Sequence, residues 1–231
     1  MIRLDRIRLI GLPFLLNLSI KQTNYINIKN EEFWNTITHF LGVILTIIGI
    51  PFLFYFNSEI TRYSELSLIL FSIGLLLVYI SSTLYHYTQN ELIKKKLRVF
   101  DHISIFYLIL GSYAPVCLIT LYDSSGFLIF ICVLFLTLTG TLIKLFFFEK
   151  LQFLSLVLYV LMGWLIIIDF NNLFQIISIE AKLLLVTSGL SYTLGLVFYY
   201  LDRIKYFHSI WHIFVLLGSI FHYFLVLLYI I

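Results

Sequence analysis

Residues 208–231 read HSIWHIFVLLGSIFHYFLVLLYII, a stretch in which apolar side chains predominate. A helix needs about 20 such residues to cross the hydrocarbon core of a bilayer, which is roughly 30 Å thick. His208 and His212 stand at its start, and a helix places residues four apart on one face, about 6 Å apart along its axis. That spacing suits two ligands of one metal ion, and it also suits two polar side chains satisfied at a membrane interface.

Six further apolar runs of similar length precede this one. The seven expected spans are residues 37–56, 66–85, 103–122, 127–148, 151–170, 183–201 and 210–231. Hydrophobic residues make up 61% of the 231 residues and charged residues 12%, a composition outside the range of soluble domains. The linkers are short, so consecutive spans are expected to be antiparallel neighbours. The sequence therefore predicts an all-α membrane protein built as a seven-transmembrane helix bundle.

The distribution of cations predicts how the bundle is oriented. Residues 1–30 form a basic N-terminal extension ahead of the transmembrane domain, residues 31–231, and no cleavable signal peptide is expected because Pro13 interrupts its apolar stretch. Of the 15 lysine and arginine residues, 13 fall on the side of the N-terminus when loops alternate between faces. The positive-inside rule then predicts a cytoplasmic N-terminus and an outer C-terminus. The run from Lys94 to Arg98 is expected between spans, against anionic lipid.

Composition also limits the classes of function. Cations lie in short segments between apolar runs and form no patch with interleaved aromatic residues, so nucleic-acid binding is not expected. Cys117 and Cys132 fall inside apolar runs, where a cysteine packs as a small apolar residue.

Few residues interrupt the spans. Pro115, one turn after Gly111, is predicted to kink the third span, and neighbouring helices can satisfy the carbonyl that a proline frees. The remaining span glycines are expected where helices pack closely: Gly74, Gly140, Gly163, Gly189, Gly195 and Gly218.

Polar residues gather at the span ends on the side of the N-terminus. His86 follows the second span, and Ser82 lies one turn deeper on the same face. Asp101 precedes the third span, and His208 and His212 open the seventh. Three imidazoles and a carboxylate are therefore predicted to converge at one membrane surface. Three protein ligands and an open position are the arrangement of a catalytic zinc, and ionisable residues placed in a membrane are candidates for function.

Other polar residues have weaker claims to a site. His39 lies at the same end of the first span without a partner four residues away, so direct metal contact is the less favoured expectation. For His102 a packing role is favoured over orienting a metal ligand or transferring a proton, and His222 is expected to be hydrogen-bonded deep in the bundle. Glu31 and Glu32 are expected to be solvated charges, with an interfacial cap or lid as the alternative.

Five ordered segments carry a family resemblance. They are EEFWNTITH (residues 31–39), STLYH (82–86), DH (101–102), GSYAP (111–115) and HSIWH (208–212). From about Glu31 to the last residue, the sequence resembles the bacterial hemolysin III family, a branch of the progestin and adipoQ receptor superfamily that is more remotely related to alkaline ceramidases. Phe40 stands where the family pattern has a small glycine and Tyr87 where it has a serine, both beside the expected ligand set.

The resemblance implies a seven-helix bundle in the bacterial inner membrane with a zinc ion near the cytoplasmic face. It implies His86, His208 and His212 as the ligands, with Asp101 reaching the zinc through water and Ser82 nearby. It also implies hydrolysis of a lipid, because relatives cleave the amide of ceramide.

Three functions compete at this point. The first is a zinc-dependent hydrolase of an acyl lipid taken from the membrane, with Asp101 as general base and Ser82 helping to hold the oxyanion. The second is a non-enzymatic membrane sensor or homeostasis factor, in which zinc only clamps spans together. The third is a pore, which the sequence disfavours because no charged stripe lines a conduction path.

Overall fold

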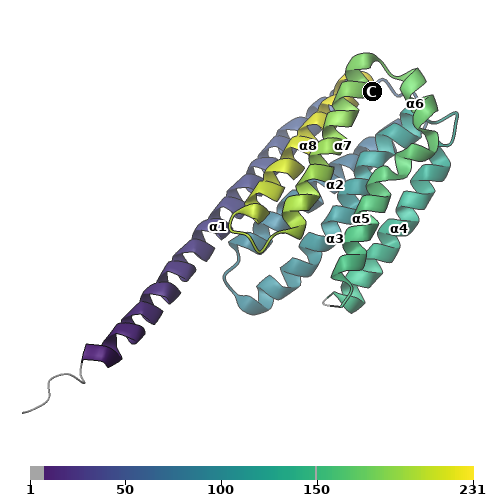
Figure 1. Ribbon diagram of the computed structural model, residues 1–231. Helices are drawn as coiled ribbons and strands as arrows, with labels where there is room; N and C mark the ends of the chain where they lie inside the picture. Colours follow the sequence, from purple (N-terminus) through teal and green to yellow (C-terminus); the bar gives the residue numbers. More distant parts are fainter. Residues whose placement is uncertain (1–7, 149) are drawn as a thin grey trace, which may run out of the picture.

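The computed structural model describes residues 8–148 and 150–231, with side chains from Asn30 onward. Within this part, seven helical segments are long and apolar enough to cross a membrane, which confirms the predicted all-α bundle. Figure 1 shows these helices side by side, with the first part of α1 projecting beyond them. The first seven residues of the basic extension lie outside the described part.

The elements run in the following order: α1 (Arg8–Tyr55), α2 (Ser64–Tyr87), α3 (Glu91–Pro115), a π-helical turn η1 (Val116–Thr120), α4 (Gly126–Phe147), α5 (Gln152–Trp164), a 3-10 turn η2 (Leu165–Asp169), α6 (Phe170–Ile176), α7 (Ile179–Tyr200) and α8 (Phe207–Tyr229). α2 packs against α1 and α3, and α8 packs against α7 and α1. α3 also packs against α4, which makes it the most buried span of the bundle.

Two helices begin earlier than hydropathy predicts because polar side chains cap them. The Asn90 side chain accepts hydrogen bonds from the N–H groups of Leu92 and Ile93, so α3 starts at Glu91 and the run from Lys94 to Arg98 is helical. These cations precede the apolar part of α3 and lie between the second and third apolar runs. Ser178 caps α7 in the same way, by accepting from the N–H of Ala181 at 3.2 Å.

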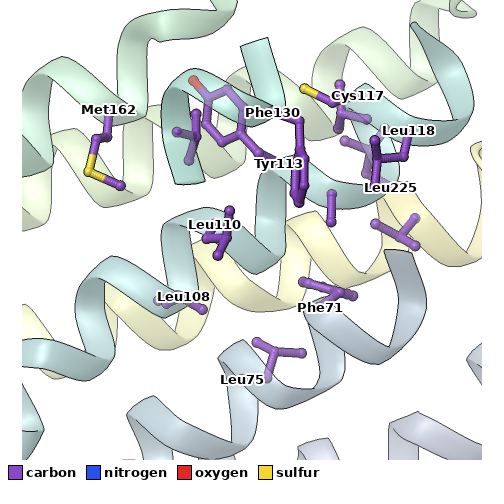
Figure 2. Close-up of a cluster of buried hydrophobic side chains, with 14 of the residues drawn as sticks. Phe71, Leu75, Leu108, Leu110, Tyr113, Cys117, Leu118, Phe130, Met162 and Leu225 are labelled. Carbon is purple, nitrogen blue, oxygen red and sulfur yellow. The ribbon is translucent and has the colours of Figure 1, made fainter. Parts of the chain in front are cut away.

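The apolar core is built around α3. Figure 2 shows part of it, with Leu108, Leu110 and Tyr113 of α3 among side chains from α2, α4, α5 and α8. Phe71 of α2 and Phe106 of α3 are completely buried. α3 is thus packed from several sides, and within a bilayer it is this close packing, and not removal of the side chains from water, that holds helices together.

The predicted irregularity at Pro115 is present and is compensated by a histidine. α3 ends at Pro115 and continues as the π-helical turn η1. The N–H of Val116 bonds to the carbonyl of Tyr113 instead of that of Ser112. His222 Nε2 lies 2.9 Å from the Ser112 carbonyl oxygen and donates to it. The prediction that His222 is hydrogen-bonded inside the bundle is thereby confirmed.

The fifth span is broken, which the sequence did not predict. At the junction of α5 and η2, the Tyr113 hydroxyl donates to the carbonyl of Gly163 at 3.1 Å and accepts from the N–H of Ile166 at 3.0 Å. At the other end of η2, the Asp169 carboxylate accepts from the Ser125 hydroxyl at 2.7 Å. Both ends of the break are thus held by side-chain hydrogen bonds, as a break inside a bilayer requires.

The glycines divide into two groups. A Cβ built on Gly74 or Gly140 would come within 3.0 Å of a neighbouring helix, and Gly195 and Gly218 are similarly close, as predicted. A Cβ on Gly163 of α5 or Gly189 of α7 would meet no atom within 4 Å. For these two the predicted close packing was wrong, because they border a cavity between α5 and α7.

Candidate metal centre

Three histidines meet at the end of the bundle where α2 ends and α8 begins. One nitrogen each of His86, His208 and His212 lies within 4.8 Å of the other two, and in the described part of the chain these three form the group able to share an ion. His86 and His212 are buried, and His208 is partly buried. The ring centroids are 4.7 to 5.1 Å apart. The structure thus brings together the three ligands expected from the sequence.

A sharp turn before α8 places two of these rings. Tyr206, which precedes α8, has a φ of 66°, in the left-handed region that residues other than glycine seldom adopt. Its N–H donates to Glu31 Oε1 at 3.1 Å, which ties the turn to α1. His208 therefore lies in the first turn of α8, with His212 one turn further on the same face.

Residues of α1 orient two of the rings, those of His86 and His212. His86 Nδ1 lies 2.7 Å from Glu32 Oε2, and Lys94 Nζ donates to the other carboxylate oxygen at 2.9 Å. His212 Nδ1 lies 3.2 Å from the carbonyl oxygen of Asn35. Since both acceptors are oxygens, the Nδ1 atoms donate and the Nε2 atoms are left for an ion. Carboxylates and carbonyls commonly orient metal-binding histidines in this way.

The role of Glu32 was missed from the sequence. Its expected assignment as a solvated charge was wrong, because the side chain is only 25% exposed and bonds to both His86 and Lys94. A signal was present nonetheless. Glu32, Asn35 and His39 are spaced by three and four residues, so they lie on one face of α1.

The polar atoms left unpaired fit a bound cation. His86 Nε2 and His208 Nε2 are buried and have no hydrogen-bond partner among the residues that the structure describes. An unpaired buried polar atom costs about 1–3 kcal/mol, so such atoms call for a ligand. Neutral imidazole nitrogens are ligands of Zn, Cu, Fe and Ni, and three of them leave coordination positions open.

Asp101 and Ser82 border the same space but stand outside the ligand group. Both line a cavity that His208 and His212 also line. Ser82 is fully buried, and its hydroxyl faces the Asp101 carboxylate without a well-formed hydrogen bond. The two residues lie where the predicted base and oxyanion donor would be needed, and their catalytic roles stay predictions.

His39 occupies a position behind the ligand group. Its ring stacks on that of His212, with 3.7 Å between centroids and 21° between planes. Within the described residues, both of its nitrogens are buried and unpaired, and the residue lies outside the group that can share an ion. The arrangement agrees with the expectation that direct metal contact is the less favoured role.

Two hollows meet beside the histidines. The first is a cavity of about 320 Å³ that runs into the bundle between α3, α5, α7 and α8, lined mainly by apolar side chains that include Trp164 and Phe174. The second is a more polar hollow of about 490 Å³ at the end of the bundle, lined by residues such as Glu31 and Arg203. His102, Tyr199 and His208 line both. A group bound at the histidines could therefore be approached both through the apolar cavity and through the polar hollow.

The chain is similar to known proteins over most of its length. A sequence model of the haemolysin-III related family matches residues 27–223. The chain is 38% identical over 200 residues to the hemolysin-3 homolog of Bacillus subtilis (strain 168), covering 86% of this chain and 94% of that protein. It is 32% identical over 211 residues to hemolysin-3 of Bacillus cereus, covering 91% and 96%. It is 26% identical over 205 residues to the human monocyte to macrophage differentiation factor, covering 84% and 82%.

Proposed function

The chain belongs to the haemolysin-III related family, and we propose that it is a zinc-dependent hydrolase of an acyl lipid, an amide or an ester, that contributes to membrane lipid homeostasis. Its seven apolar helices and bacterial relatives make it an integral protein of the bacterial inner membrane. One observation carries the proposal. The unpaired nitrogens of His86 and His208 lie where an apolar cavity meets a polar hollow.

The donor set supports zinc as the ion. Three histidines with an open fourth position are the ligand set of catalytic zinc sites, whereas structural sites are usually closed by four protein ligands. When bound, zinc would acidify a water molecule and polarise an acyl carbonyl. His86, His208 and His212 would hold it through Nε2, with Glu32 and Asn35 fixing two of the rings.

The chain's own residues divide the remaining work. Asp101 would accept a proton from the attacking water and return it to the atom that leaves the acyl carbon. The Ser82 hydroxyl, which makes no well-formed hydrogen bond within the described residues, would donate one to the carbonyl oxygen as it gains charge. Both residues line the cavity, so they would face a carbonyl bound there.

The cavity supports an acyl chain as part of the substrate. Its wall includes Gly163 and Gly189, which leave open space between α5 and α7. α5 packs against α3 and α4, and α7 packs against α8, but α5 and α7 are not among the helix pairs of the described residues that pack closely against each other, so a lipid tail could enter between them from the bilayer. By the cation distribution we place the histidine end of the bundle at the cytoplasmic surface, which would let water enter through the polar hollow.

The decisive experiment combines metal analysis with turnover. Purified wild type should carry one zinc per chain and hydrolyse at least one member of a panel of acyl amides and esters. Asp101→Asn should keep the zinc and lose turnover, whereas His208→Ala should lose both. A zinc-loaded wild type that is inert toward the whole panel would refute the proposal.

A structural role for the ion is the rival function. The ligand group joins α2 to α8, and its supporting hydrogen bonds come from α1, so an ion there would also hold three helices together. In a sensor built on this clamp, His212→Ala would unfold the bundle and Asp101→Asn would change nothing. If the chain is a hydrolase, Asp101→Asn should instead fold and bind the metal but lose turnover.

A further inference from the structure

A buried lysine lies close to the proposed site and has no acidic partner within the described part of the chain. Lys144 of α4 is 1% exposed, and its Nζ lies 3.4 Å from His102 Nδ1 and 4.9 Å from the centre of the Phe148 ring. Among the described residues, no carboxylate lies within 4.0 Å of it. An ammonium group held inside a membrane protein is costly, so its placement calls for a reason beyond packing.

The contact with Lys144 decides which nitrogen of His102 carries the proton. An ammonium group can only donate hydrogen bonds, so Nδ1 of His102 must accept. The Tyr199 hydroxyl lies 3.1 Å from the same nitrogen and competes for it as a second donor. In the neutral ring the proton is therefore on Nε2. The Tyr159 hydroxyl donates to the backbone carbonyl of His102 at 2.7 Å, which fixes the residue from another side.

This oriented ring stands at the meeting point of the two hollows. His102 lines both the apolar cavity and the polar hollow, together with Tyr199 and the candidate ligand His208. It follows Asp101 directly in the chain, and both line the cavity where the acyl carbonyl would be bound. Its hydrogen bonds within the described residues use Nδ1, so Nε2 is the nitrogen available to a ligand.

We propose that His102 is a further catalytic residue, whose Nε2–H donates a hydrogen bond to the atom that leaves the acyl carbon, and that Lys144 and Tyr199 are positioning residues that hold it in this tautomer. The inference rests on the proposed hydrolase function. In the reaction, the oxygen of water forms a bond to the acyl carbon, and the bond from that carbon to the leaving nitrogen or oxygen breaks. Asp101 transfers the water proton to the leaving atom, and His102 stabilises the negative charge that develops there before the proton arrives.

A purely structural explanation exists for Lys144 and makes a different prediction. Lys144 lies in the last turn of α4, where a cation interacts favourably with the carbonyl end of a helix. In that case its loss would alter stability and would affect all substrates equally. The proposed role instead predicts an effect that depends on the leaving group.

The test compares two substrates with the same acyl chain on zinc-loaded, detergent-solubilised protein: an N-acyl amide, whose leaving amine is poor, and a p-nitrophenyl ester, whose leaving oxygen is stable as an anion. We expect His102→Leu to lower kcat for the amide by about 10²–10³-fold, as for loss of a hydrogen-bond donor to a transition state, with KM and zinc content unchanged. For the ester we expect a loss of less than about tenfold. His102→Gln keeps both an N–H donor and an acceptor for Lys144 and should recover most of the amide rate.

The controls separate the possible failures. Lys95→Met removes an exposed lysine of α3 and should leave both rates unchanged, whereas Lys144→Met should lower the amide rate selectively. Equal losses on both substrates in His102→Leu, or no loss on either, would overturn the assignment. The two substrates carry the acyl chain of the panel member that the wild type hydrolyses fastest. A zinc-loaded wild type that is inert toward the whole panel would refute the hydrolase function and this inference with it. An active wild type beside an unimpaired His102→Leu variant would refute this inference alone.

A spectroscopic readout is independent of turnover. In protein labelled with ¹⁵N-histidine, the His102 signals should report a protonated Nε2 and an unprotonated Nδ1. Lys144→Met should shift the Nδ1 resonance, because it removes the donor. A protonated Nδ1 in the wild type would contradict the proposed orientation.

Discussion

Replacement of Glu32 by alanine tests how far the supporting residues contribute to metal binding. The Glu32 carboxylate lies 2.7 Å from His86 Nδ1, a distance typical of a charge-assisted hydrogen bond. Loss of such an orienting group commonly weakens metal binding by about 10- to 100-fold. Lys94 shares the carboxylate and the side chain is 25% exposed, so we expect the lower part of that range, about 10- to 30-fold or about 1.4–2 kcal/mol.

The assay is a competitive zinc titration against a chromogenic chelator. Glu32→Gln keeps an acceptor for His86 but loses the charge, so its affinity should fall between the wild type and Glu32→Ala. Glu65→Gln is the matched control, because Glu65 is an exposed residue in the first turn of α2, at the end of that helix opposite His86. The reasoning would be refuted if Glu32→Ala bound zinc as tightly as the wild type, or if Glu65→Gln weakened binding equally.

Three further outcomes are expected. Gly189→Leu should fill part of the cavity and abolish lipid turnover while the protein stays folded and zinc-bound. Gly140→Leu should instead unfold the bundle, because Phe106 lies 2.3 Å from the position of an added Cβ. Thermal unfolding and turnover, measured on both variants, check this pair. His222→Leu should lower the free energy of unfolding by about 1–3 kcal/mol by leaving the Ser112 carbonyl unpaired, measured by chemical denaturation in detergent. Removal of the ion by a chelator should lower the unfolding temperature of the wild type, and zinc should restore it, because a ligand bound only by the folded state stabilises that state.

The number and order of the spans could be read from the sequence because hydrophobic length is a local property. The ends of the helices were harder to predict, because a single capping side chain such as Asn90 or Ser178 extends a helix beyond its apolar run. The break in the fifth span was out of reach. It depends on Tyr113, a residue of another helix, which supplies the hydrogen bonds that the broken backbone needs.

In the candidate site, too, some residues could be predicted from local spacing and others depend on how the helices pack. His208 and His212 share a helix face by spacing alone, and His86 joins them because antiparallel spans bring their ends to one surface. Spacing also places Glu32 on one face of α1 with Asn35 and His39, but its bond to His86 depends on α1 packing beside α2, which spacing alone does not show.

The glycines show why local pattern fails at the cavity. Gly140 and Gly189 both lie within apolar helices with nothing in the flanking residues to separate them, yet one meets an aromatic ring and the other meets open space. What distinguishes them is whether a neighbouring helix is present on that side. The α5–α7 side of the bundle is where such a neighbour is lacking, and there the open space reaches the same His208 and His212 that the sequence singled out. The proposed lipid substrate would therefore depend on both features, the locally encoded histidines and the gap that only the assembled helices create.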